Sequence, residues 1–202
     1  ALAAELGATH AVADVGDAAA LGAAIAAAGE SIDGLAYAVG SLRLAPLQRI
    51  TEAQLLEDFR LHAVGAVLTV QAALAQLKRA RGTSSVLLFS SIAVRQGFPS
   101  HVSVGMAKGA IEGLVTSLAA ELSPKVRVNA IAPSLTRTPL AAGLLSNEQM
   151  ATAIAGMHPL QRLGEADDIA ATGALLLSAD AGWITGQVIG VDGGRSTLRP
   201  KG

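Results

Sequence analysis

The sequence predicts an α/β protein, a three-layer arrangement with helices on both faces of a parallel sheet. Short apolar runs rich in Val, Ile and Leu recur along the chain, and long amphipathic stretches separate them. This order is typical of parallel strands that are buried on both faces and joined by helices. With 202 residues and no evident linker or internal repeat, residues 1–202 are expected to form one domain.

The expected elements alternate between strand and helix over most of the chain. In chain order they are a strand near 9–14, a helix near 18–28, a strand at 34–39, a helix near 52–79, a strand at 85–90, a helix near 102–122, a strand at 126–131, helices near 145–157 and 166–178, and a strand near 187–191. Residues 1–6 are predicted to be helical, with Gly7 as the C-terminal cap, and residues 199–202 form a frayed tail.

Composition and charge exclude several classes of protein. Without cysteine, the chain can form neither a disulfide framework nor a catalytic thiol nor a cysteine-ligated metal site, and its histidines have no spacing that suggests a metal. A net charge of −1 gives no electrostatic reason to expect nucleic acid or an anionic membrane. No run approaches the roughly 18 apolar residues of a membrane span, and no charged leader precedes an apolar segment, so a cytoplasmic location is expected.

Two segments near the middle of the chain carry the strongest functional signal. Residues 86–93 have the sequence VLLFSSIA, which contains Ser91, and residues 108–114 have the sequence KGAIEGL. Both resemble the short-chain dehydrogenase/reductase family, in which a strand-end serine, a tyrosine and a lysine one helical turn beyond the tyrosine perform hydride transfer. The resemblance implies that Ser91 and Lys108 belong to the catalytic site. Val104 stands four residues before Lys108, where the tyrosine is expected.

The presence of Val104 bears directly on activity. Hydride transfer to a carbonyl needs a proton donor within hydrogen-bonding reach of the oxygen, and a phenol serves once a nearby ammonium lowers its pKa. The i, i+4 spacing places both groups on one helix face. A valine has no proton to give, and the single tyrosine of the chain, Tyr37, lies in a different part of the resemblance.

The resemblance extends along nearly the whole chain, through residues 9–15, 33–40, 126–139, 163–170 and 184–194. It implies a Rossmann-like, doubly wound parallel sheet and NAD or NADP as the cofactor. The positions that it assigns to cofactor binding are Asp14, Gly40, Lys108, Pro133, Thr136 and Thr138. For Gly40, close approach of a ligand and a simple turn are equal alternatives, and the two threonines are either ligands of a ribose or phosphate or plain turn residues.

One unit of the resembled fold is not found in the 202 residues. Family members open with a strand, a glycine-rich turn and a helix, which place backbone amides against the pyrophosphate of the cofactor. By alignment, at least about 30 residues of a strand–helix–strand unit are missing, so we expect an N-terminally incomplete fold that does not bind the cofactor. The strand around Val12 would then have no neighbour and the strand around Leu35 an open edge, so the first residues should be displaced, rearranged or exchanged with another copy.

His62 suggests an alternative activity. It stands where the family carries an asparagine whose helix kink helps to hold a water against the lysine. The histidine is either a polar residue that fills the same space or a base. In the second case His62, Ser91 and Lys108 would converge on one pocket, and a nucleophile, a base and a cation are the minimum required for acyl transfer.

Three functions therefore remain open. The first is a divergent NAD(P)-dependent oxidoreductase with weak or no activity in this form, the second a small-ester hydrolase (esterase) that uses Ser91, and the third a catalytically silent oligomeric module. The expected partners are a small carbonyl, alcohol or ester substrate and further copies of the chain. Small residues on two helices allow close packing, and the resemblance implies a homodimer or homotetramer built on them: Gly65, Ala66, Gly109, Ala110 and Gly113.

Overall fold

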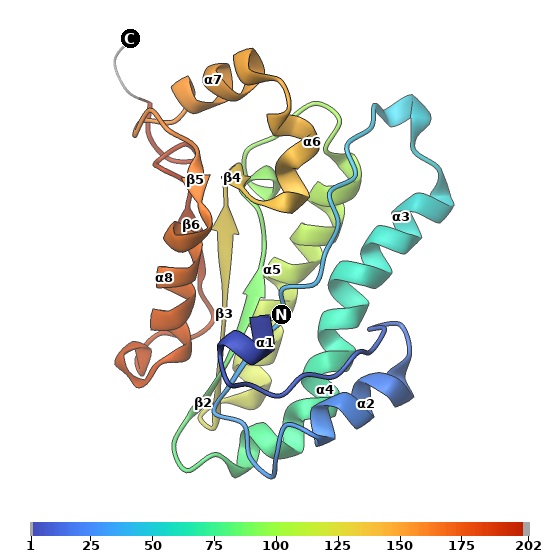
Figure 1. Ribbon diagram of the computed structural model, residues 1–202, viewed down its shortest axis with the longest axis vertical. Helices are drawn as coiled ribbons and strands as arrows, with labels where there is room; N and C mark the ends of the chain where they lie inside the picture. The colour runs from blue at the N-terminus through green and yellow to red at the C-terminus, as the bar shows by residue number, and fades with distance from the viewer. Residues whose placement is uncertain (1, 200–202) are drawn as a thin grey trace.

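In the computed structural model, which describes residues 2–199, a parallel sheet runs through the molecule with helices packed against it (Figure 1). Its strands, in order across the sheet, are β1 (Gly34–Ala36), β2 (Ser84–Phe89), β3 (Val126–Pro133) and β6 (Val188–Val191). Each neighbouring pair is parallel. The predicted α/β fold is confirmed, while residues 200–202 of the expected tail and Ala1 lie outside the described residues.

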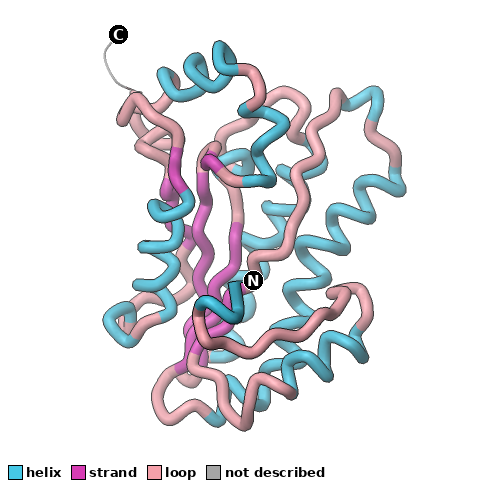
Figure 2. The backbone as a smooth tube through the Cα atoms, in the orientation of Figure 1, coloured by secondary structure: helices cyan, strands magenta, loops and turns pink. Residues whose placement is uncertain are grey.

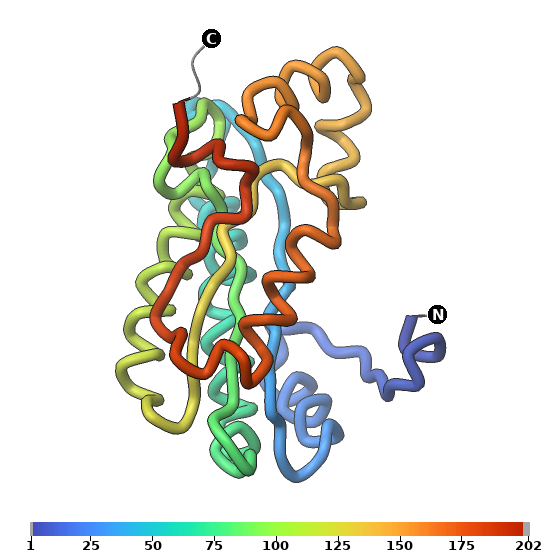
Figure 3. Tube along the Cα trace, turned by 90° about the vertical axis from the view of Figure 1, so that its left-hand side faces the viewer, coloured from blue at the N-terminus to red at the C-terminus, as the bar shows by residue number. Residues whose placement is uncertain are grey.

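Helices cover both faces of the sheet (Figure 3). The main covering helices are α4 (Gly65–Arg79) and α5 (Val102–Leu122) on one face and α8 (Ala166–Leu177) on the other. Because successive residues of a strand point to opposite sides, Val86 and Leu88 join the core under α4 and α5, whereas Leu87 packs with Leu176 of α8. β2 is therefore apolar on both faces, as its sequence predicts.

The helix predicted near 52–79 is a single rod with an irregular middle. α3 (Glu52–Phe59) begins at a capping box formed by Thr51 and Gln54, and a π-helical turn, Arg60–Val64, joins it to α4. The sequence does not predict this wide turn, a feature that is frequent at functional sites. By length and composition the rod could span a membrane, but half of its most apolar window is buried inside the protein, as expected of a core helix.

The start of the chain differs from the prediction. Residues 9–14 form no strand, and the side chain of Val12 is 97% exposed. The strand predicted at 34–39 is reduced to β1, which lies at the edge of the sheet with one neighbour among the described residues. Figure 3 shows the first residues turned away from the sheet. A strand needs a partner for its backbone groups, and residues 2–199 supply none at this edge, so the displacement of the first residues agrees with the prediction.

The remaining elements near the N-terminus are helical. α1 (Leu2–Glu5) ends as predicted at Gly7, whose φ is +61° and whose successor Ala8 donates a hydrogen bond to the carbonyl of Ala3 at 2.8 Å. α2 (Ala18–Ala26) is capped by the side chain of Asp17 and packs on α4. Between β1 and α3 the chain is an irregular loop apart from a short 3₁₀ turn (Figure 2).

The C-terminal third contains more short elements than predicted. The helix expected near 145–157 is divided into α6 (Ala142–Leu145) and α7 (Glu148–Gly156), and α7 begins at the capping residue Asn147. β4 (Thr136–Arg137) and β5 (Gly164–Glu165) form a separate parallel pair. Strands of two residues have no periodic pattern, so the sequence gives no signal for them.

Candidate active site

The carboxyl ends of β2, β3 and β6 lie at one edge of the sheet, and the catalytic residues expected from the sequence start there. Ser91 follows β2 by two residues and begins a 3₁₀ turn, where its Oγ accepts a hydrogen bond from the N–H of Ala93 at 3.1 Å. Because the oxygen acts as the acceptor in this contact, the hydroxyl proton of Ser91 remains available to a ligand.

Lys108 reaches the same edge from α5. Its ammonium donates to the carbonyl oxygen of Phe89, the last residue of β2, at 2.8 Å. Burial lowers the pKa of Lys108 to about 8, and no carboxylate among residues 2–199 forms an ion pair with it. An ammonium has three donors, so two N–H groups of Lys108 remain for a ligand or water.

Val104 lies one helical turn before Lys108 and is 6% exposed. It contributes an apolar wall and no proton. Tyr37 does not take over this role, because its hydroxyl is used inside the fold, where it donates to the carbonyl of Leu61 at 2.6 Å. Gly65 makes room for that hydroxyl, so this small residue serves the packing of one protomer.

His62 lies in the π-helical turn and is 2% exposed. Its Nε2 accepts the backbone N–H of Ser41 at 3.3 Å, which assigns the proton of the neutral ring to Nδ1. Burial, reinforced by the positive charge of Lys108, lowers the pKa of His62 to about 4, against the opposing influence of Asp58. The ring is therefore neutral near pH 7, and its Nδ1 has no hydrogen-bond partner among the described residues.

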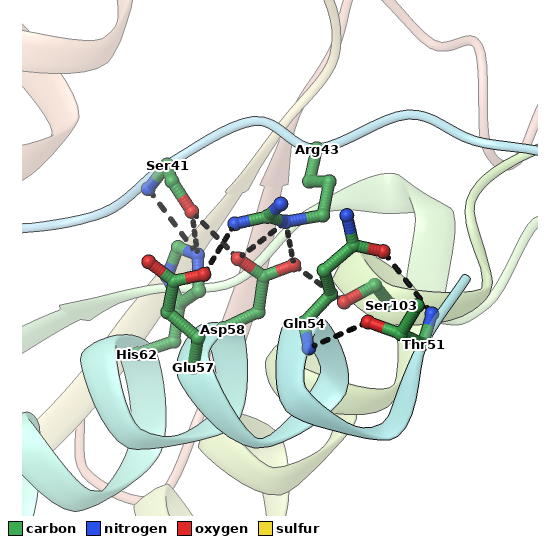
Figure 4. Close-up of polar contacts among 8 residues, drawn as sticks. All are labelled: Ser41, Arg43, Thr51, Gln54, Glu57, Asp58, His62 and Ser103. Atoms are coloured by element: carbon green, nitrogen blue, oxygen red, sulfur yellow. Dashed lines mark hydrogen bonds and ion pairs between the residues drawn. The ribbon is translucent and has the colours of Figure 1, made fainter. Parts of the chain in front are cut away.

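A polar cluster that the sequence does not reveal lies beside His62 (Figure 4). At its centre Asp58, 2% exposed, accepts hydrogen bonds from Ser41 Oγ at 3.1 Å, from Arg43 Nε and from Ser103 Oγ. Arg43 also pairs with the exposed Glu57 at 2.7 Å. We call Ser41, Arg43, Asp58 and Ser103 the Asp58 cluster. It ties the loop after β1 to α3 and to the first turn of α5.

The geometry expected of a hydrolase at Ser91 is not found. Ser91 Oγ has no hydrogen bond to Lys108 or to His62 among residues 2–199: Lys108 donates to Phe89, and Nε2 of His62 accepts from Ser41. A nucleophilic serine requires such a contact with its base. No group of three or more His, Asp or Glu side chains in the described chain has the arrangement of a metal site.

The residues expected to bind the cofactor are not gathered at one place. Asp14 lies in the irregular segment near the N-terminus, where its carboxylate accepts the N–H of Gly16 at 2.7 Å. A Cβ at Gly40 would lie 2.6 Å from Cε1 of His62, so this glycine is required by the packing of that ring. Pro133 ends β3, and the hydroxyl of Thr136 donates to the carbonyl of Ser134 at 3.0 Å, within the turn itself.

Thr138 Oγ1 makes a similar local contact, 3.5 Å from the carbonyl oxygen of Thr136. Both threonines, together with Pro133, follow β3 at the edge that also holds Ser91 and Lys108. This part of the expected cofactor set is compatible with a ligand at that edge, and Asp14 and Gly40 lie at other places in the structure with the local contacts described above.

Comparison with known proteins identifies the family. A sequence model described as Enoyl-(Acyl carrier protein) reductase matches residues 1–196. The 2-(S)-hydroxypropyl-CoM dehydrogenase 3 of Xanthobacter autotrophicus is 36% identical over 196 residues, which cover 92% of this chain and 76% of that protein. A tropinone reductase homolog of Arabidopsis thaliana is 42% identical over 123 residues, 58% of this chain and 45% of that protein.

Solved structures agree with this assignment. Gluconate 5-dehydrogenase from Burkholderia cenocepacia, in complex with NADP and tartrate, has a TM-score of 0.90 and 26% identity, covering 98% of this chain and 81% of that chain. A short-chain type dehydrogenase/reductase from Mycobacterium ulcerans has a TM-score of 0.85 and 30% identity, covering 92% and 69%. The chain belongs to the short-chain dehydrogenase/reductase family of oxidoreductases, and it spans about half the length of several curated relatives that it matches.

Proposed function

We propose that this chain carries the hydride-transfer site of an NAD(P)-dependent oxidoreductase that acts on a small carbonyl compound or alcohol. The observation that supports this most is the ammonium of Lys108, which is held by Phe89 at the carboxyl end of β2, two residues before Ser91 and its free hydroxyl proton. Ligands of open α/β sheets bind at this edge of the strands. Membership of the family adds support for the reaction class.

The described residues include groups that could contact the nicotinamide half of a cofactor. They do not include groups that would hold its pyrophosphate and adenosine half. Two unused donors on Lys108 suit ribose hydroxyls, with Pro133, Thr136 and Thr138 following the neighbouring strand. The described residues hold no glycine-rich turn between a strand and a helix, and Asp14 is engaged with Gly16. We therefore expect the 202-residue chain alone to bind NAD(P) too weakly to measure by titration calorimetry, and expect binding in a longer version that supplies such a unit.

When bound, the nicotinamide supplies or accepts the hydride, and the chain's own residues must orient the substrate and move the proton. Ser91 donates a hydrogen bond to the substrate oxygen and keeps its own proton, which fixes the position of that oxygen. Lys108 then delivers the proton that Val104 cannot, directly or through one water. A proton donor works best when its pKa lies near the working pH, and the lowered pKa of Lys108, about 8, meets that condition.

The test uses a longer version of the chain that carries the upstream strand, glycine-rich turn and helix. Reduction of small aldehydes and ketones is followed by the loss of reduced nicotinamide. Lys108→Met and Ser91→Ala should each lower kcat by on the order of 10² or more, because each removes a group that acts on the reacting oxygen. The matched control is Lys78→Met, an exposed lysine of α4, which should leave kcat unchanged. Wild-type kcat in Lys108→Met would overturn the proposal.

We also propose that α4 and α5 pair with a second copy. Val67 and Met106, on these two helices, are 40% and 44% exposed, and a Cβ added at Gly113 would meet nothing within 4 Å. In contrast, Gly65 and Ala66 are buried within the protomer and are not part of this surface. The exposed side of α4 and α5 thus contains fewer of the small residues than the sequence predicts. It is still apolar enough for a self-complementary contact between two copies.

A further inference from the structure

A serine–histidine pair lies at the carboxyl ends of β3 and β6. Ser134 directly follows β3, and its Oγ is 2.8 Å from Nε2 of His158, the residue two positions after α7. His158 is 1% exposed, although its sequence environment gives no hint of a partner. Serine and histidine are 24 residues apart, and the folding of α6 and α7 back over the sheet brings them together.

The hydrogen bonds of His158 define which nitrogen holds the proton. Nδ1 lies 2.8 Å from the carbonyl oxygen of Ile154, which can only accept, so Nδ1 of the neutral ring must donate. Nε2 then has a lone pair and accepts the hydroxyl proton of Ser134. This is the arrangement in which a histidine acts as the base for a serine nucleophile, with a third group fixing the ring. The carboxylate of Asp192, 9% exposed, lines the same cavity as His158.

The pair opens into a cavity of about 120 Å³. Its walls include Thr136, Arg162, Leu163 and Gly193 in addition to Ser134 and His158. The backbone N–H of Gly193 has no acceptor within residues 2–199, which leaves it available for a negatively charged oxygen. The cavity has room for a short acyl group beside the Ser134 hydroxyl.

We propose that Ser134 is a nucleophile, activated by His158, that accepts short acyl groups from activated esters or thioesters. Ser134 Oγ forms a bond to the acyl carbon while its proton passes to Nε2 of His158. The bond from the acyl carbon to the leaving oxygen or sulfur breaks, and the leaving alcohol or thiol takes that proton. Water then attacks the acyl-serine with His158 again receiving the proton, which releases the acid and restores Ser134. No nicotinamide, oxidant or reductant takes part, so the proposal is independent of the oxidoreductase function.

The experiment uses the 202-residue chain and p-nitrophenyl acetate without nicotinamide. After brief reaction and acid quench, trypsin should release residues 128–137, in which Ser134 is the single serine. We expect an acetyl group on Ser134 in that peptide, located by fragmentation and distinguished from Thr136. Because this readout needs no variant, it tests the proposal even if substitutions in the pair impair folding. An unmodified peptide 128–137, or acetylation confined to other residues, would overturn the proposal.

Variants then test the roles of the two residues. Ser134→Ala should lower the initial release of nitrophenolate by on the order of 10² or more, and His158→Gln should slow it similarly, because each removes one half of the reacting pair. Ser146→Ala, which removes an exposed serine hydroxyl in the segment before α7, is the matched control and should react like the wild type. Wild-type release of nitrophenolate in Ser134→Ala would overturn the proposal.

Discussion

Two polar groups of residues flank the first turns of α5, and they differ in how fully their hydrogen-bonding capacity is used. In the Asp58 cluster, the buried carboxylate receives three side chains as donors and the charge is paired with Arg43. At the sheet edge, Ser91 keeps its hydroxyl proton and Lys108 keeps two donors. Paired groups hold a structure together, whereas unused donors at the carboxyl edge of a parallel sheet are available to a substrate. The Asp58 cluster therefore supports the structure around the site, and Ser91 and Lys108 are the residues available for its chemistry.

The largest effect on stability is expected in the Asp58 cluster. Asp58→Ala leaves the half-buried hydroxyl of Ser41 and the buried hydroxyl of Ser103 without their acceptor and removes one of the two carboxylates that Arg43 contacts, which should cost about 2–3 kcal/mol of unfolding free energy. Urea denaturation followed by circular dichroism measures it. Glu57→Ala is the matched control, because it removes an exposed partner of the same Arg43 and should cost about 1 kcal/mol or less. Equal losses in the two variants would show that Asp58 has no special structural role.

A smaller effect on stability is expected from His62, whose buried ring makes the unfolding free energy depend on pH. Since its folded pKa, about 4, is below the unfolded value of about 6.5, the unfolded state binds more protons between these values, and stability falls as the pH decreases through this window. From pH 7 to about pH 5 this loss amounts to roughly 2 kcal/mol. Over the same pH range, the unfolding free energy of His62→Asn should fall less than that of the wild type, and the difference should be roughly 2 kcal/mol. Urea denaturation at each pH measures both values. A parallel decline in both proteins would contradict the assignment of a buried neutral ring.

The smallest effect on the fold is expected at the outer face of α5. Gly113→Trp points into open space, so it should leave the unfolding free energy within about 0.5 kcal/mol. If two copies pair through this face, the bulky side chain should shift the protein toward monomer on a sizing column with light scattering. Gly82→Trp, on the loop before β2 where an added side chain also meets nothing within 4 Å, serves as the control. A wild-type monomer at high concentration would rule out the pairing.

The periodicity of apolar residues predicts most of the helices and strands. The differences from the prediction arise where a segment depends on contacts with residues far away in the sequence. The ranges of α5, β2 and β6 agree with the sequence to within about two residues because their periodicity is strong. The segment around Val12 has equally favourable residues for a strand and forms none, since a strand depends on its neighbour.

The site shows the same division. Ser91 and Lys108 follow from their spacing and from the family resemblance. The Asp58 cluster and the pair of Ser134 with His158 join residues that are 15 or more positions apart with no common motif, so neither can be predicted from local pattern. For Gly40 the sequence leaves ligand approach and a turn as equal alternatives, and it does not predict the neighbouring ring of His62, which lies in the wide turn of the helix.

We propose that Lys108, rather than a tyrosine, supplies the proton, and this role predicts a specific pH dependence of catalysis. In the longer version of the chain, kcat for carbonyl reduction should be constant below the pKa of Lys108, about 8, and should fall about tenfold per pH unit above it, because the ammonium loses the proton that it delivers. Lys108→Arg, whose guanidinium stays protonated, should show no such decline even if its rate is low. A wild-type kcat that is unchanged from about pH 7 to about pH 10 would contradict the account.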